Sequence, residues 1–223
     1  MNELKSPLIV SSQQAPHKNL AKQVRKYQQT CMQDSIPKHA YDAFEIARQF
    51  VINDSVILDS GCGTGESSFR LAREFPHLKV LGIDKSISRL QRSHAHGQAP
   101  KNLLLLQADC IHLWRLIKQA QWDIHEHYLF YPNPWPKPGH LQRRWHAHPV
   151  FPTLLALAGE IVMRSNWKIY AQEFAQAIEI SCSCTAEVKQ LMLDADAAFT
   201  AFERKYLHSG HELYEVRVGL REL

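Results

Sequence analysis

The apolar residues of this chain fall into short runs separated by segments with helical spacing. Aliphatic and β-branched residues gather at 56–58, 78–83 and 103–106, and the stretch 66–74 between the first two runs has the pattern of a helix. Short apolar strands that alternate with helices are typical of a parallel sheet covered on its faces. The pattern therefore predicts an α/β fold.

Further elements are expected on both sides of these strands. They are helices at 20–27, 40–50, 152–159 and 167–180, strands at 124–131, 160–165 and 212–218, a short segment at 188–193 and a loop over 200–203. Residues 1–20 are polar and aperiodic, which predicts a poorly ordered leader. We divide the chain into a leader with a basic helix over 1–37 and one domain over 38–223.

A glycine-rich turn follows the first strand directly. Asp59 ends that strand, and three glycines come next: Gly61, Gly63 and Gly65. Glycines at this spacing let main-chain N–H groups approach a ligand closely. Glu66 stands where a dinucleotide-binding turn has its third glycine, and the Asp59 carboxylate repels phosphate but attracts an ammonium group. The turn suits S-adenosylmethionine, although a flexible turn without a ligand has the same pattern.

Three successive strands are each followed by a carboxylate, namely Asp59, Asp84 and Asp109. In a doubly wound sheet, ligands bind at the carboxyl ends of the strands. Asp84 is placed to accept ribose hydroxyl groups, and Asp109 to accept from an adenine amino group. Aspartate also caps helix N-termini, and this alternative stays open for each of them.

A proline-rich segment follows the strand at 124–131. Four of the seven residues from Pro132 to Pro138 are proline. Proline fixes the backbone, so Asn133 and Trp135 are presented rigidly at the carboxyl edge of the sheet. A rigid loop at that edge indicates an active site, in which Trp135 either stacks on a base or packs on the sheet.

Charge is distributed unevenly along the chain. The formal net charge of +4 over 223 residues indicates no particular partner. No acidic residue lies between Glu126 and Glu160, and the basic side chains in that window include Lys137, His140, Arg143 and Arg144. This composition favours a surface that contacts phosphate, with a solvated basic loop as the alternative.

Composition indicates the class of protein, its compartment and the state of its cysteines. With 45% hydrophobic and 22% charged residues, and no apolar stretch long enough to span a bilayer, the chain has the composition of a soluble globular protein. The first ten residues lack the basic and long apolar regions of an export signal, so we expect a cytoplasmic protein. Five scattered cysteines without C-x-x-C spacing favour reduced thiols, and no metal site is expected.

Taken together, these residues resemble the bacterial tRNA (guanine-N7)-methyltransferase family. The run from Tyr131 to Lys137, followed by His140, Arg143 and Arg144, is similar to that family's F-P-D-P-W-x-K-x-x-H-x-x-R-R block. This block is the most specific part of a resemblance that covers about residues 38–218.

Two further segments carry the same resemblance. Ser165-Asn166-Trp167 with Tyr170 is similar to the family's T-D-W-x-x-Y, and the run from Thr200 to Glu203 with Gly210-His211 is similar to its T-x-[FY]-E and G-H elements.

The resemblance implies a Rossmann-like class I methyltransferase with a mostly parallel seven-stranded sheet and helices on both faces. It also implies S-adenosylmethionine as cofactor and tRNA as partner. On the cofactor side it places Asp59, Gly61, Gly63, Gly65, Asp84, Asp109 and Asn133, with Asn133 also the catalytic candidate. On the substrate side the candidates are Lys137, His140, Arg143, Arg144, Asn166, Thr200 and Glu203.

Asn133 and Asn166 stand where the family has aspartate. Guanine N7 carries a lone pair and no proton, so methyl transfer to it needs positioning but no general base. Carboxylates instead recognise the N1–H and N2–H₂ edge and stabilise the charge that develops on the ring. Because asparagine keeps an acceptor oxygen without the charge, a weakened reaction is expected.

Three functions stay open from the sequence. They are a tRNA (guanine-N7)-methyltransferase, a paralogue that binds S-adenosylmethionine and RNA with altered or weak activity, and a small-molecule methyltransferase. The window without acidic residues disfavours the third. The choice between monomer and homodimer stays open.

Overall fold

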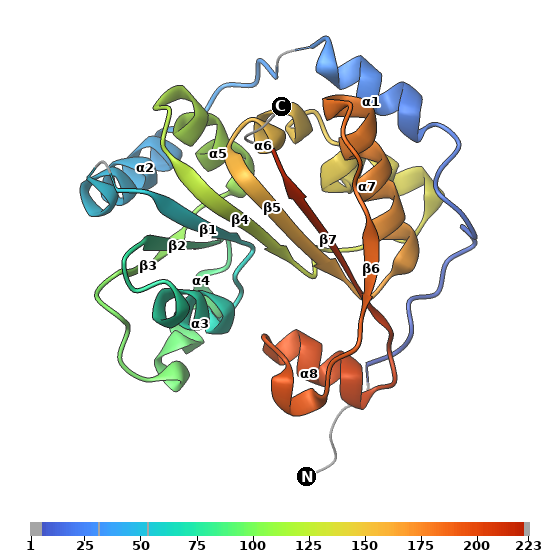
Figure 1. Ribbon diagram of the computed structural model, residues 1–223. Coiled ribbons are helices and arrows are strands. Elements are labelled where there is room, and N and C mark those ends of the chain that lie inside the picture. The colour runs from blue at the N-terminus through green and yellow to red at the C-terminus, as the bar shows by residue number, and fades with distance from the viewer. Residues whose placement is uncertain (1–5, 31, 53, 221–223) are drawn as a thin grey trace.

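The computed structural model describes residues 6–30, 32–52 and 54–220, and within them seven strands form one sheet (Figure 1). The strands are β1 Val56–Ser60, β2 Lys79–Asp84, β3 Leu103–Gln107, β4 Ile124–Phe130, β5 Ala158–Ser165, β6 Val188–Leu191 and β7 Leu213–Gly219. Their order is β3-β2-β1-β4-β5-β7-β6, and β7 runs opposite to the other six strands. The predicted mostly parallel seven-stranded sheet is confirmed.

Helices cover both faces of the sheet. They are α1 Leu20–Gln28, α2 Lys38–Val51, α3 Glu66–Glu74, α4 Ile87–Leu90, α5 Cys110–Gln119, α6 Phe151–Leu155, α7 Lys168–Cys182 and α8 Ala201–His208, with 3₁₀ turns η1 Gln91–His96, η2 Pro138–Arg143, η3 Trp145–Ala147 and η4 Ala195–Ala197. Within the described residues, no helix is long and apolar enough to cross a bilayer.

The alternation of side chains along β1 explains why each face of the sheet has its own hydrophobic cluster. Side chains of a strand point in turn to opposite sides, so Val56 and Leu58 enter one hydrophobic cluster and Ile57 enters the other. The first cluster includes Trp114 of α5 and Phe174 of α7 among its buried side chains. The second cluster is smaller and is formed with α3. Every residue of β1 is buried, which accounts for its continuous apolar sequence.

Two predicted elements differ from the structure, and one helix was not predicted. The helix expected at 152–159 ends at Leu155, because β5 begins at Ala158 to pair with Ile124 of β4. The predicted loop over 200–203 is instead the start of α8, which Thr200 caps. Helix α5 was not predicted at all, although its buried positions have helical spacing.

Helix α1 packs against α7, as the blue and orange helices of Figure 1 show. Leu20 and Val24 are buried in the same hydrophobic cluster as the sheet. The basic helix placed in the leader therefore contributes to the core of the domain.

Candidate functional site

The glycine turn lies at the carboxyl end of β1 and is fixed to β2. Gly61, Gly63 and Gly65 have φ angles of 78°, 62° and 84°, in the left-handed region that favours glycine. The N–H groups of Gly61 and Cys62 donate to the Ile83 carbonyl at 2.7 and 3.0 Å. These hydrogen bonds fix the turn to the sheet. A Cβ added at Gly61 or Gly63 would meet nothing within 4 Å, so there is open space beside both residues.

Asp59 is buried behind this turn. Its Oδ2 accepts hydrogen bonds from Ser67 and Ser68 at 2.6 Å each, whereas Oδ1 is buried with no partner among the described residues. Burial raises the pKa of Asp59 to about 6, against the opposing hydrogen bonds from the two serines. Oδ1 therefore keeps an unused acceptor position, but Asp59 lines neither of the two cavities of the site.

Asp84 ties the glycine turn to the end of β2. Its carboxylate accepts from the N–H of Gly63 at 3.0 Å and of Ser86 at 2.7 Å, and pairs with the Arg89 guanidinium at 2.9 Å. A carboxylate has about four acceptor positions, so about one stays free. A ribose presents two hydroxyl groups, so a ribose that donates both of them to Asp84 competes with Arg89 for the carboxylate.

Asp109 is half-buried and caps α5 by accepting from the Ile111 N–H at 2.8 Å. The capping alternative is thus correct for one of its two oxygens. Asp109 also lines a cavity of about 530 Å³, together with Gly61, Asp84 and Asn133. A volume of this order suits a nucleoside-sized ligand.

The proline-rich loop forms one side of this cavity, which is the larger of two at the site. Asn133 is exposed, and its side-chain oxygen accepts from the Trp135 N–H at 3.3 Å. The Arg143 guanidinium lies 4.7 Å from the centre of the Trp135 ring, a cation–π distance. The His140 ring meets Trp135 edge-on at 5.5 Å. Trp135 thus packs with side chains of its own loop, and it lines the cavity together with Asn133 and Arg143.

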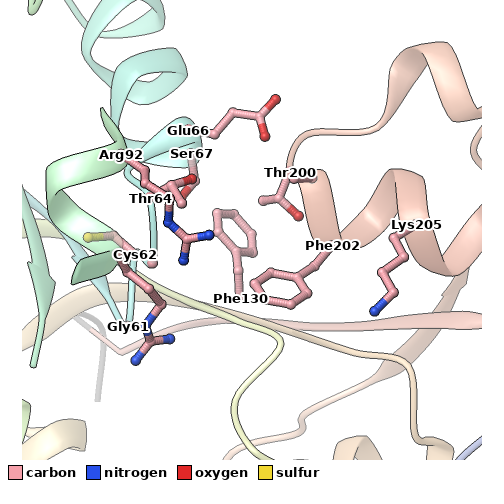
Figure 2. Close-up of a pocket in the computed structure, with 13 residues that line it drawn as sticks. Gly61, Cys62, Thr64, Glu66, Ser67, Arg92, Phe130, Thr200, Phe202 and Lys205 are labelled. Atoms are coloured by element: carbon pink, nitrogen blue, oxygen red, sulfur yellow. The ribbon is translucent and has the colours of Figure 1, made fainter. Parts of the chain in front are cut away.

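A second, smaller cavity of about 220 Å³ adjoins the first, because Gly61, Arg89 and Phe130 line both. Figure 2 shows the glycine turn and Arg92 on one side of it and α8 on the other, with Phe202 and Lys205 directed toward it. Thr200 also lines this cavity. Of the predicted substrate residues, only Thr200 is part of it.

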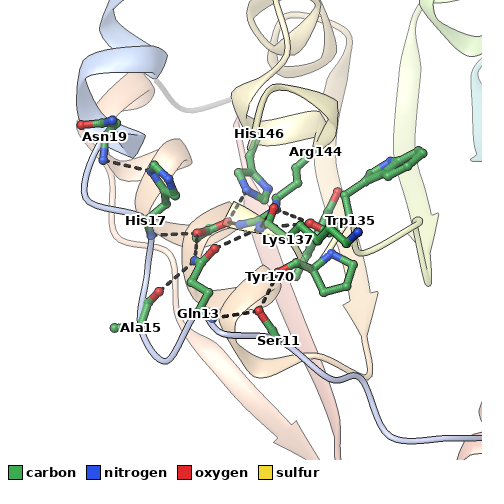
Figure 3. Close-up of polar contacts among 12 residues, drawn as sticks. Ser11, Gln13, Ala15, His17, Asn19, Trp135, Lys137, Arg144, His146 and Tyr170 are labelled. Carbon is green, nitrogen blue, oxygen red and sulfur yellow. Dashed lines mark hydrogen bonds and ion pairs between the residues drawn. The ribbon is translucent and has the colours of Figure 1, made fainter. Parts of the chain in front are cut away.

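Arg144 does not fit the predicted contact with phosphate. Its side chain is buried and pairs with Glu173 at 2.5 Å, and it donates to the Trp135 carbonyl at 3.1 Å (Figure 3). Burial opposes ionisation of Glu173, yet the hydrogen bonds from His146 and Arg144 lower its pKa to about 2. Arg144 therefore fixes the proline-rich loop to α7 and is not available to RNA.

The N-terminal arm, residues 6–19, lies over the same buried pair. Gln13 Nε2 and the His17 N–H donate to Glu173 Oε1 at 2.6 and 2.8 Å, and the Ser11 hydroxyl donates to the Pro136 carbonyl (Figure 3). The prediction of a poorly ordered leader is therefore wrong for these residues, because a buried charge provides fixed acceptors for the arm.

Glu203 and Asn166 also have structural partners. Glu203 is buried and pairs with Arg164 at 2.8 Å, while Thr200 caps α8 by accepting from the Glu203 N–H at 3.0 Å. The Asn166 amide donates to His211 at 3.0 Å. Neither Glu203 nor Asn166 lines the two cavities. The side chain of Glu203 thus positions α8, and direct contact of these two side chains with substrate stays a prediction.

Lys137 and Arg143 remain as exposed cations of the loop. Desolvation, followed by the charges of Arg143 and Lys137, lowers the pKa of His140, which disfavours the protonated ring. His140 can donate a hydrogen bond to a phosphate through its ring N–H.

The thiols nearest the site are protonated. Burial raises the pKa of Cys110 to about 12, with the Asp109 charge adding to it, and raises the pKa of Cys62 as well. Neither thiol is a nucleophile at neutral pH. In the part of the chain that the structure describes, no group of three or more His, Cys, Asp or Glu side chains is arranged to hold a metal ion.

Sequence reasoning missed several residues that line or support the site. Arg89 and Arg92 are three positions apart after Asp84, a spacing that places both on one side of a short helical segment. Lys205 was missed because the helix on which it lies, α8, was not predicted from the sequence. For Glu173 no signal exists in the sequence, because a glutamate in an amphipathic helix is expected to face solvent.

Comparison with known proteins gives a consistent picture. A family described as "Putative methyltransferase" matches residues 53–216. A tRNA (guanine-N(7)-)-methyltransferase of Brevibacillus brevis is 25% identical over 77% of this chain and 83% of its own length. One of Treponema pallidum is 28% identical over 72% of this chain and 65% of its own length.

Among solved structures, the 16S rRNA (adenine(1408)-N(1))-methyltransferase of Catenulisporales acidiphilia with the cosubstrate SAM has a TM-score of 0.54. It is 17% identical over 79% of this chain and 91% of its own. This likeness shows the fold.

Proposed function

The chain belongs to the putative methyltransferase family, and we propose that it transfers the methyl group of S-adenosylmethionine to N7 of a guanine in tRNA. The observation that carries the proposal is the larger cavity at the carboxyl edge of β1 to β4. It unites the glycine turn, two strand-end carboxylates and the proline-rich loop. The names of the relatives support tRNA and guanine N7 as the target.

The residues present fit S-adenosylmethionine. Asp84 and Asp109 line the larger cavity and supply acceptors for ribose and adenine. Asp59 lines neither cavity, and it supports the site through the hydrogen bonds that it accepts from the start of α3. The open backbone at Gly61 and Gly63 leaves room for a ligand against the turn. When bound, this cofactor supplies an electrophilic methyl group.

The chain's own contribution to the reaction is positioning. Guanine N7 attacks without losing a proton, so no general base is required of the protein. The protonated thiols of Cys62 and Cys110 are not nucleophilic, which disfavours a route through a methylated cysteine. What the site must do is orient the base in line with the methyl group and exclude water.

Asn133 is the polar side chain of the proline-rich loop that lines the larger cavity. Its carbonyl oxygen already accepts one hydrogen bond, from Trp135, and has a second lone pair for an N–H donor of the substrate. We assign it to orientation of the substrate, with less stabilisation of ring charge than a carboxylate gives.

The test is nucleoside analysis of unmodified tRNA incubated with the protein and methyl-labelled donor. The proposal predicts label in 7-methylguanosine. Asp84→Ala should abolish labelling by weakening cofactor binding, and Asp42→Ala on the exposed face of α2 should leave it unchanged. Label in another nucleoside, or none in tRNA while the cofactor binds, would overturn the proposal.

A further inference from the structure

Two cations flank the smaller cavity without counter-charges. Arg92, in η1 beside the glycine turn, and Lys205, on α8, line opposite sides of the cavity (Figure 2). Both are exposed. Neither side chain has a hydrogen-bond or ion-pair partner among the residues that the structure describes.

The other charges of this cavity are neutralised. Arg89 pairs with Asp84 at 2.9 Å. Glu66, the acidic residue of the lining, pairs with Arg204 at 2.5 Å and lies 3.9 Å from Arg70. The excess positive charge therefore comes from Arg92 and Lys205. Unpaired cations on a concave surface attract anions more strongly than the same charges on a flat one.

Aromatic rings lie between the two cations. Phe130 and Phe202 line the cavity, and Phe202 is 47% exposed although it is large and apolar. An exposed aromatic ring beside basic side chains is typical of sites that stack a nucleic-acid base and hold its backbone. Because Gly61 and Phe130 line both cavities, a base held here would lie next to the larger cavity.

We propose that Arg92 and Lys205 bind the phosphate of the RNA nucleotide whose base enters the smaller cavity, with Phe202 against that base. The inference rests on the proposed function. A base that leaves its stack brings its own phosphate to the rim of the pocket, where the forked Arg92 guanidinium and the point charge of Lys205 meet it from two sides.

The first test compares two probes that differ by one phosphate. Guanosine and guanosine 5′-monophosphate are titrated calorimetrically into protein saturated with S-adenosylhomocysteine. The wild type should bind the monophosphate about tenfold more tightly. Arg92→Gln and Lys205→Gln should each reduce this ratio, and the double variant should bring it close to one with guanosine affinity unchanged. Lys118→Gln, an exposed cation in the last turn of α5, is the matched control and should keep the ratio.

The second test is the salt dependence of tRNA binding by the same variants. The double variant should lower the slope of log affinity against log salt by about one unit, and Lys118→Gln should leave it unchanged. An unchanged ratio or slope in the double variant, or a wild type that does not prefer the monophosphate, overturns the phosphate site. Failure of the proposed function is separate, since it would appear as missing 7-methylguanosine with the phosphate preference intact.

Discussion

At the scale of single residues, burial decides which charges of the site can act. Asp59 has a pKa raised to about 6 because the fold removes its carboxyl group from water. Arg144, by contrast, stays charged in the core because Glu173 compensates it. The buried carboxyl groups of Asp59 and Glu173 therefore have pKa shifts in opposite directions, because only Glu173 has a buried cation beside it.

The Asp59 carboxyl group should make stability depend on pH. Its pKa is higher in the folded chain than the ordinary 3.8, so the folded state binds more protons between about pH 4 and pH 6 and loses stability as pH rises through that window. Asp59→Asn should therefore gain about 3 kcal/mol in unfolding free energy relative to the wild type between pH 4 and pH 7. Urea unfolding at several pH values measures this, with Asp42→Asn as control. A difference that stays constant across pH would contradict it.

Asn133 gives a second prediction at this scale. Asn133→Asp places a carboxylate at the wall of the larger cavity, where it can accept from the substrate and stabilise positive charge on the ring. The rate of guanine-N7 methylation should rise about tenfold, the effect of roughly 1.4 kcal/mol in the transition state. Single-turnover assays on tRNA measure it. Gln142→Glu adds the same charge elsewhere on this cavity and should not raise the rate; an equal rise in both variants would show a general charge effect.

At the scale of elements, the buried Glu173 carboxylate joins three parts of the chain. Glu173 lies on α7, Arg144 caps η3 and His146 lies in it, and Gln13 belongs to the N-terminal arm. Arg144 in turn donates to the Trp135 carbonyl. The proline-rich loop is thus held in place by Glu173 on α7 and by Gln13 of the arm, and neither residue lines the larger cavity.

Loss of the Glu173 charge should be costly. Glu173→Gln keeps the shape of the side chain but leaves the Arg144 guanidinium buried without a counter-charge, which should lower the unfolding free energy by about 3–5 kcal/mol. Denaturant unfolding at pH 7 measures this. Glu74→Gln, at an exposed position in the last turn of α3, should change it by less than about 0.5 kcal/mol. Equal effects of the two substitutions would show that the pair does not hold the loop.

At the scale of the whole molecule, the parallel part of the sheet brings distant segments to one edge. The glycine turn, Asp84, Asp109 and the proline-rich loop follow four different strands and meet because parallel strands end on the same side. Helix α8, which lies far from these segments in the sequence, forms one wall of the smaller cavity.

A ligand bound at this edge should stabilise the entire fold. S-adenosylhomocysteine at a hundred times its dissociation constant contributes about 2.7 kcal/mol, which should raise the melting temperature by about 5–10 °C for a chain of this length. Asp84→Ala should remove most of the shift and Asp42→Ala none of it. Differential scanning calorimetry measures these shifts. A full shift in Asp84→Ala would place the cofactor elsewhere.

The sequence by itself determined the sheet, the glycine turn and the position of the proline-rich loop. These depend on short-range patterns: apolar runs form buried strands, glycine allows the turn, and proline fixes the loop. The sequence also indicated correctly that Asp84 and Asp109 meet at one edge, because that follows from parallel strands.

Only the tertiary structure decided which polar residues are free. Arg143 and Arg144 are neighbours in sequence, yet one is exposed and the other is buried against Glu173, 29 positions away. Arg92 and Lys205 line the same cavity only because α8 packs across the sheet edge from the glycine turn. Burial and charge pairing depend on contacts between distant segments, and a local pattern carries no information about which segment arrives to compensate a charge.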